Sequence, residues 1–175
     1  MPVPYRKTPK AAEEGSAAYL DVVYLRSTQT FYAALLLLDG RGQPLEFLHN
    51  HLVAPSGFLW PEERVAAFGA VELAHSLFSA CRRDPDLLVC AASLGSPEFC
   101  RSEIAPSLPF AQITPGLEKS PDEWIWLNEP PAPGMRASGL AQELQKRGFL
   151  FEPFQRIRYG LKEIYPDAPW AEAKG

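Results

Sequence analysis

The feature that most constrains this fold is an ordered series of apolar segments between residues 19 and 92. The run 19–26 is apolar and β-branched, and a second apolar run at 31–38 follows four polar residues, which favours two strands of a hairpin. The segment 39–42, Asp-Gly-Arg-Gly, is a strong turn signal because glycine accepts positive φ. After it, the alternating run 45–52 predicts a half-exposed strand. The fold is therefore expected to begin as an antiparallel meander of three strands.

Residues 61–81 show the strongest helix signal in the chain. Pro61 is followed by two acids, which suits the first turn of a helix, and an apolar stripe continues to Cys81. The stripe at helical spacing consists of Ala66, Ala70, Leu73, Leu77 and Ala80. The short, continuous apolar run 86–92 that follows is typical of a strand buried on both faces. A long helix before such a strand predicts an α/β fold with a mixed sheet.

The last third of the chain has weaker patterns. Residues 108–113 and 123–127 predict short strands, and the second of these is rich in aromatic residues. A proline-rich linker at 130–133 precedes two segments with helical spacing, 139–146 and 152–165. We therefore expect two C-terminal helices.

Composition and pattern together suggest one main domain. With 46% hydrophobic residues among 175, the chain can bury one sizeable core. Residues 1–16 lack periodicity and are predicted to be a flexible arm. We assign 17–128 to an α/β core and 129–175 to a Pro-rich linker with C-terminal helices.

Charge and cysteine content limit the classes of function. The chain has no apolar stretch near the roughly 20 residues that span a bilayer, and no secretory signal is visible, so no membrane association is expected. Three cysteines without Cys-x-x-Cys spacing predict free thiols in the cytoplasm. A net charge of −4 argues against binding nucleic acid by bulk electrostatics, but a local basic patch is compatible with it.

The order of these elements is that of the ribonuclease H-like fold, and residues 18–119 resemble the endonuclease V family. The segments that carry the resemblance are 20–24 (Leu-Asp-Val-Val-Tyr), 33–42, 60–61 (Trp-Pro), Phe68, 84–89 (Asp-Pro-Asp-Leu-Leu-Val), 95–100 and 108–119. The resemblance implies two divalent ions, Mg²⁺ or Mn²⁺, held by carboxylates that cut a phosphodiester. It also implies single-stranded or damaged nucleic acid as the partner.

The catalytic residues implied by the resemblance match this sequence only in part. Asp21 matches the first-strand aspartate and would be a catalytic metal ligand. The helix glutamate falls on Ala70, so that Glu72 is the nearest acid, and the aspartate that ends the fourth strand falls on Ala91. Lys119 matches the last-strand lysine with altered spacing. The resemblance therefore implies a degenerate or lost cleavage activity.

Binding residues have competing interpretations. Trp60, next to Pro61, could stack on a base, or it could pack the loop against the start of the helix. Arg156, Arg158 and Lys162 give the last predicted helix a basic side. This side is either a phosphate-binding patch or an ordinary solvated face.

The other polar candidates also have structural alternatives. Asp21 lies in an apolar strand, where a carboxylate needs partners, solvent or a neighbouring loop. Glu72 could simply lie on a solvated helix face. His49 and His51 point to the same side of the predicted third strand, where they could share a metal after some bending or face solvent.

Two functions follow from these patterns. The first is an endonuclease V-like domain that processes or binds nucleic acid. The alternative is a non-enzymatic interaction module of longin, roadblock or profilin-like type, which binds a protein partner or a second copy through aromatic residues between Trp124 and Trp170. The fourth strand distinguishes them, because only the first interpretation pairs it beside the first strand and brings Ala91 near Asp21.

Overall fold

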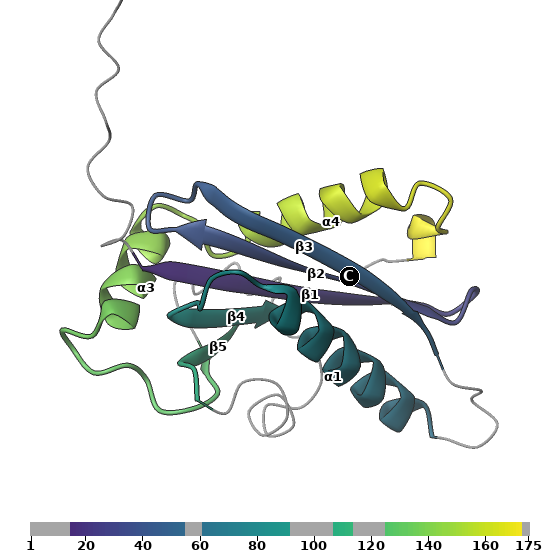
Figure 1. Cartoon of the computed structure of the whole chain (residues 1–175), viewed down its shortest axis with the longest axis horizontal. Helices are drawn as coiled ribbons and strands as arrows, with labels where there is room; N and C mark the ends of the chain where they lie inside the picture. Colours follow the sequence, from purple (N-terminus) through teal and green to yellow (C-terminus); the bar gives the residue numbers. More distant parts are fainter. Residues whose placement is uncertain (1–14, 55–60, 92–106, 114–124, 173–175) are drawn as a thin grey trace, which may run out of the picture.

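The computed structural model describes residues 15–54, 61–91, 107–113 and 125–172. They form a six-stranded sheet with helices on both faces (Figure 1). The strands are β1 (Ser16–Leu25), β2 (Thr30–Asp39), β3 (Pro44–Val53), β4 (Leu87–Ala91), β5 (Phe110–Ile113) and β6 (Ile125–Trp126). The helices are α1 (Glu62–Ala80), α3 (Arg136–Lys146) and α4 (Glu152–Ile164), followed by the 3-10 turn η3 (Trp170–Glu172).

The strand order is β3-β2-β1-β4-β5-β6, with β1 near the centre. β1 pairs antiparallel with β2, and β2 with β3, so the predicted meander is confirmed. β4 pairs parallel with β1, and β5 parallel with β4. This order and these directions confirm the predicted ribonuclease H-like sheet, and the pairing of β1 with β4 is the one that this interpretation required.

The two faces of the sheet carry separate hydrophobic clusters. Figure 1 shows α1 on one face and α4 on the other. Because side chains alternate along a strand, Ala18 and Leu20 of β1 belong to the cluster under α1, whereas Tyr19 and Val23 belong to the cluster under α4. We call these sides the α1 face and the α4 face. β1 is therefore buried on both faces.

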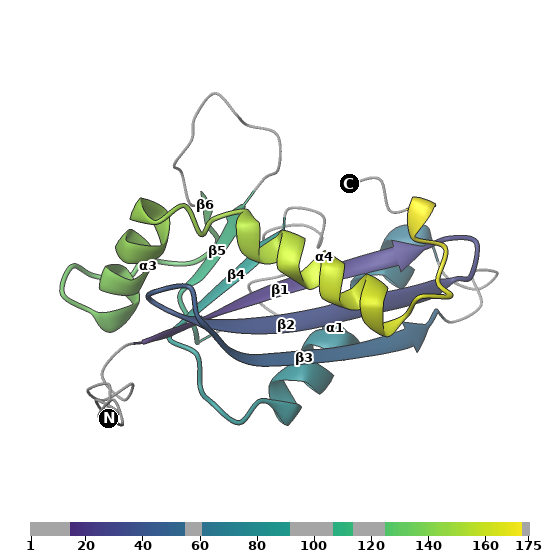
Figure 2. The same cartoon turned by 90° about the horizontal axis from the view of Figure 1, so that it is seen from above.

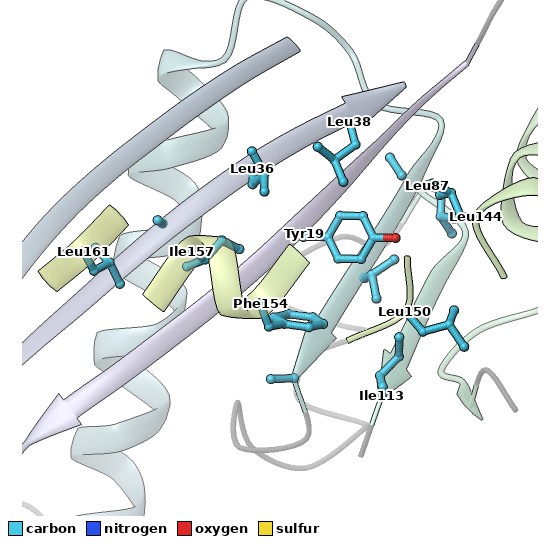
Figure 3. Packing of buried hydrophobic residues seen from close by; sticks show 14 of the residues in the cluster. Tyr19, Leu36, Leu38, Leu87, Ile113, Leu144, Leu150, Phe154, Ile157 and Leu161 are labelled. Carbon is cyan, nitrogen blue, oxygen red and sulfur yellow. The ribbon is translucent and has the colours of Figure 1, made fainter. Parts of the chain in front are cut away.

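The C-terminal helices complete the core on the α4 face. α4 contributes Phe154, Ile157 and Leu161, and α3 contributes Leu140, Ala141 and Leu144. Figure 3 shows the Tyr19 ring beside Phe154, and their centroids are 5.6 Å apart with the planes at 75°. The Tyr19 hydroxyl donates to the Phe149 carbonyl at 2.6 Å, and burial raises the pKa of this phenol. The start of α4 is thereby joined to β1.

The predicted turn between the second and third strands is also confirmed. Asp39 Oδ1 accepts hydrogen bonds from the backbone N–H groups of Arg41 and Gln43 at 2.9 and 2.8 Å. Gly42 has φ +76°, and a Cβ atom there would lie 2.4 Å from the Phe149 ring. Arg156 Nη1 donates to the Gly42 carbonyl at 2.9 Å. The turn therefore helps to hold α4 on the sheet.

Some element boundaries differ from the predicted ones. The first C-terminal helix begins at Arg136, before the expected 139, and the predicted strand 123–127 is represented by Ile125–Trp126, since 123 and 124 lie outside the described residues. Among the described helices, none has the length and apolar character needed to cross a membrane.

Candidate functional site

Asp21 lies in the middle of β1 on the α4 face. In the sheet register it is opposite Ala34 of β2, and it lies on the same face as the buried side chains of Tyr19 and Val23, two residues away on either side. Its side chain is 0% exposed. Burial in apolar surroundings raises the pKa of the Asp21 carboxyl, while the charge of Arg158 and its hydrogen bond act in the opposite direction. The carboxylate therefore depends on that cation for its stability.

α4 supplies the partner of this carboxylate. Arg158 Nε donates to Asp21 Oδ2 at 3.0 Å, and the arginine side chain is 34% exposed. Asp21 Oδ1 is buried and has no hydrogen-bond partner in the part of the chain that the structure describes. The arrangement is an ion pair between the central strand and the helix above it, with one carboxylate oxygen left unsatisfied.

The position next to Asp21 on β4 is occupied by Ala91, whose side chain is a methyl group. Leu20 pairs with Cys90, so Ala91 is level with Asp21 on the adjacent strand. Ala91 is 3% exposed and belongs to the cluster on the α4 face, which is the face of Asp21. The fold thus brings together the two positions that the resemblance assigned to metal-binding acids, and one of them carries no acid.

Glu72 does not share a site with Asp21. It is an exposed residue of α1, and the buried residues of that helix, including Ala70 and Leu73, belong to the cluster on the α1 face. The sheet therefore separates Glu72 from Asp21, and a catalytic role for Glu72 stays a prediction that would need a different site. The predicted residues Trp60 and Lys119 lie outside the described residues.

The predicted basic patch on α4 is used largely within the fold. Arg156 Nε donates to Glu152 Oε1 at 2.6 Å, and its guanidinium carbon lies 5.6 Å from the Phe149 ring centroid. Arg158 is bonded to Asp21. Lys162, in the last turn of the helix, is exposed. Binding of nucleic acid by these three residues stays a prediction, and the geometry leaves Lys162 as its most accessible member.

The described residues do not fit a divalent metal at Asp21. Mg²⁺ and Mn²⁺ prefer several oxygen ligands, of which carboxylates carry the compensating charge. Within the described ranges no group of three His, Cys, Asp or Glu residues is placed to hold a metal ion. One oxygen of Asp21 already accepts from a guanidinium, and Ala91 offers no ligand. A cation at this position would share the Asp21 carboxylate with the Arg158 guanidinium.

The predicted aromatic C-terminal surface is mostly interior. Phe154 is buried, and Trp126, Phe149 and Trp170 pack against the cluster on the α4 face. Tyr159 and Phe151 are exposed, at 68% and 39%, and Trp124 lies outside the described residues. The alternative of a protein-interaction module stays a prediction, and its exposed aromatic surface within the described residues consists of Phe151 and Tyr159.

An aromatic cluster that the sequence did not reveal lies where the C-terminal end of α4 meets the sheet. It consists of Tyr32, His49, His51, Tyr165 and Trp170. The Tyr165 hydroxyl lies 3.0 Å from His49 Nδ1, and burial raises the pKa of that phenol. The two histidines predicted to share one side of the strand are two of the five residues of this cluster, but no local signal placed Tyr165 and Trp170 beside them.

Comparisons with known proteins give fold-level similarities only. No protein-family model matches this sequence, and neither does any curated protein. Among solved structures, endonuclease V from Bacillus subtilis aligns with TM-score 0.46 and 12% identity over 58% of this chain and 45% of that chain.

Two further structures are similar over a comparable part of the chain. Endonuclease V from Streptomyces avermitilis aligns with TM-score 0.46 and 16% identity over 58% of this chain and 46% of that one. Marinitoga piezophila Argonaute, in complex with a guide RNA, has TM-score 0.36 and 7% identity over 60% of this chain and 17% of that one. The chain spans less than half the length of each. The ribonuclease H-like fold of this protein rests on the strand order and pairing described above.

Proposed function

We propose that this protein is a nucleic-acid-binding domain of ribonuclease H-like, endonuclease V-type fold that does not cut its ligand through a metal at Asp21. The observation that carries the proposal is the buried ion pair between Asp21 and Arg158. In it, a guanidinium neutralises the carboxylate that the resemblance assigns to a metal.

Electrostatics explain why this arrangement opposes metal-dependent cleavage. A two-metal mechanism needs carboxylates that hold cations on either side of the scissile phosphate. Here Arg158 places a positive charge against Asp21, and the adjacent Ala91 adds no negative charge. A divalent ion would meet repulsion from the guanidinium, and among the described residues it would find no group of three acidic, His or Cys ligands.

The proposed ligand is single-stranded or damaged nucleic acid, and the proposed compartment is the cytoplasm. With a net charge of −4, the protein is expected to bind weakly and with strong dependence on salt, because every phosphate contact releases counterions. Lys162 is a suitable cation for such a contact, because it is exposed and lies in the last turn of α4.

A cleavage assay tests the loss of activity. Purified protein with Mg²⁺ or Mn²⁺ is incubated with inosine-containing DNA or RNA, and the products are separated on a denaturing gel. We expect no metal-dependent product from the native protein or from Asp21→Asn. Robust cleavage by the native protein that disappears in Asp21→Asn would overturn the proposal.

A binding assay tests the remaining function. Fluorescence anisotropy with a labelled single-stranded oligonucleotide should show affinity that falls with salt, and Lys162→Gln should reduce the slope of log K against log[salt] by about 0.7, the value for one single-strand phosphate contact. The matched control is Lys146→Gln, an exposed lysine in the last turn of α3. No binding at low salt would refute the nucleic-acid function.

A further inference from the structure

β2 and β3 place an aromatic and an imidazole ring side by side at the edge of the sheet. Tyr32 and His51 are directly opposite each other in the β2–β3 register. Their ring centroids are 6.0 Å apart, and the planes differ by 20°. β3 is the last strand of the sheet in the described residues, and His51 is exposed. Of these two stacked rings, His51 is therefore the outer one, and its imidazole is accessible.

The C-terminal segment supports these two rings from the α4 face. The Tyr165 ring lies 5.0 Å from Tyr32 at 62° and 5.3 Å from His51 at 66°. Trp170 lies 5.1 Å from Tyr32, and its Nε1 donates to the Tyr165 carbonyl at 2.8 Å. The Tyr165 hydroxyl is 3.0 Å from His49 Nδ1. These edge contacts and hydrogen bonds fix the rings, so little conformational entropy would be lost when a ligand binds.

We propose that the exposed side of the His51 ring is a stacking site for one base of a single-stranded nucleic acid. The inference rests on the proposed function and assigns a residue to its binding surface. A planar base stacked on His51 would add a third ring to the stacked pair of Tyr32 and His51. Bases of any sequence have a π face, and one base stacked on a protein ring contributes about 1–3 kcal/mol.

The chemistry around His51 favours a base over an apolar peptide. The neighbours of His51 on the same face of β3 are His49, which is exposed, and Val53, which is 65% exposed, whereas Asn50 faces α1 and donates to Ser76. Among the described residues of β3, this surface therefore carries two imidazoles and one aliphatic side chain, which is too little for an apolar docking patch. Lys162 is an exposed cation in the last turn of α4, and Tyr165, which caps this helix, contacts the His51 ring at 5.3 Å. A cation at this end of the helix would supply a phosphate contact for a nucleotide whose base lies on the His51 ring.

Three variants separate stacking from charge and from unfolding. Binding of a labelled 12-nucleotide oligothymidylate is measured by fluorescence anisotropy at low salt, with far-UV circular dichroism confirming that each variant folds. His51→Ala should weaken binding about 5- to 150-fold, which corresponds to the loss of one stacked base. His51→Phe keeps a π face and should stay within about 3-fold of the native affinity. His75→Ala changes an exposed histidine on α1, across the sheet, and should have no effect.

The outcomes distinguish this inference from the proposed function. Weak binding by His51→Ala together with near-native binding by His51→Phe supports the stacking site. Native affinity in His51→Ala overturns it while leaving nucleic-acid binding intact, and equal losses in the two His51 variants also overturn it, because the π face is then irrelevant. Failure of the native protein to bind overturns both proposals.

Discussion

Replacing Arg158 by methionine tests how much the buried ion pair stabilises the fold. Arg158→Met keeps a side chain of similar length but removes its charge. The carboxylate of Asp21, which is 0% exposed, is then left without a cation. Removing one partner of a fully buried pair costs about 3–5 kcal/mol. Because Arg158 is 34% exposed, solvent screens part of this interaction, and we expect a loss of about 2–3 kcal/mol in the free energy of unfolding near pH 7.5.

A surface ion pair of the same chemistry provides the matched control. Arg147 Nε lies 3.3 Å from Glu143 Oε2, and the two side chains are 48% and 50% exposed. Arg147→Met should therefore lower stability by less than about 1 kcal/mol. Asp21→Asn in the Arg158→Met background should restore part of the loss, because a neutral amide has no charge to desolvate. The two changes together form a double-mutant cycle.

The cost of Arg158→Met should also depend on pH. Burial raises the folded-state pKa of Asp21 above its ordinary value of 3.8, so between these two values the folded protein binds a proton that the unfolded chain has released. This contribution to stability is complete below the unfolded pKa and is lost as pH rises through the folded pKa. Loss of the Arg158 charge raises the folded pKa further. The variant should therefore be closest to the native protein in stability at pH 5 and differ most near pH 7.5.

Urea unfolding followed by far-UV circular dichroism at the two pH values gives the required free energies by linear extrapolation. The control must unfold with the same m-value as the native protein at each pH. Two results would refute the reasoning: a cost of Arg158→Met no greater than that of Arg147→Met, or a cost that does not change between pH 5 and 7.5.

Further predictions concern the contacts that hold α4. Gly42→Ala should destabilise the protein by about 1–3 kcal/mol in the same unfolding assay, because φ is +76° and the new Cβ would meet the Phe149 ring. Gly139→Ala, where a Cβ meets nothing within 4 Å inside α3, should instead be neutral or stabilise by up to about 1 kcal/mol. Tyr19→Phe should cost about 1 kcal/mol by removing the hydrogen bond to the Phe149 carbonyl, and a native-like midpoint would contradict that bond.

The fold could be predicted where the determinants are local. The Asp-Gly-Arg-Gly turn at 39–42 and the continuous apolar run 86–92 identified the meander and the buried parallel strand observed at Leu87–Ala91, because turn chemistry and burial leave direct marks in a sequence. The start of α3 could not be predicted in this way. Met135 precedes it and makes no side-chain cap, so no capping residue marks the helix start at Arg136 in the sequence.

The candidate site was predictable only as separate residues. A carboxylate in an apolar strand indicated that Asp21 needs a partner, but Arg158 lies 137 residues away and its position on a basic helix side suggested a surface role. The placement of Glu72 and Asp21 on opposite sides of the sheet could not be predicted either. β1 is buried on both faces, so its sequence has no polar alternation to show which of its side chains share the face covered by α1.

The placement of α4 connects the ion pair with the proposed binding surface. One carboxylate at position 21 and one guanidinium at position 158 neutralise each other, whereas a second acid at position 91 would leave an uncompensated buried charge, so the methyl group of Ala91 suits this arrangement. α4 lies over β1 and β2 (Figure 2), and the Asp21 side chain is fully buried beneath it. On the α4 face, His51 of β3 remains exposed at the edge of the sheet. Under the proposed function, a nucleic acid that approaches this face would contact the exposed imidazole of His51, while the Asp21 carboxylate stays buried beneath α4.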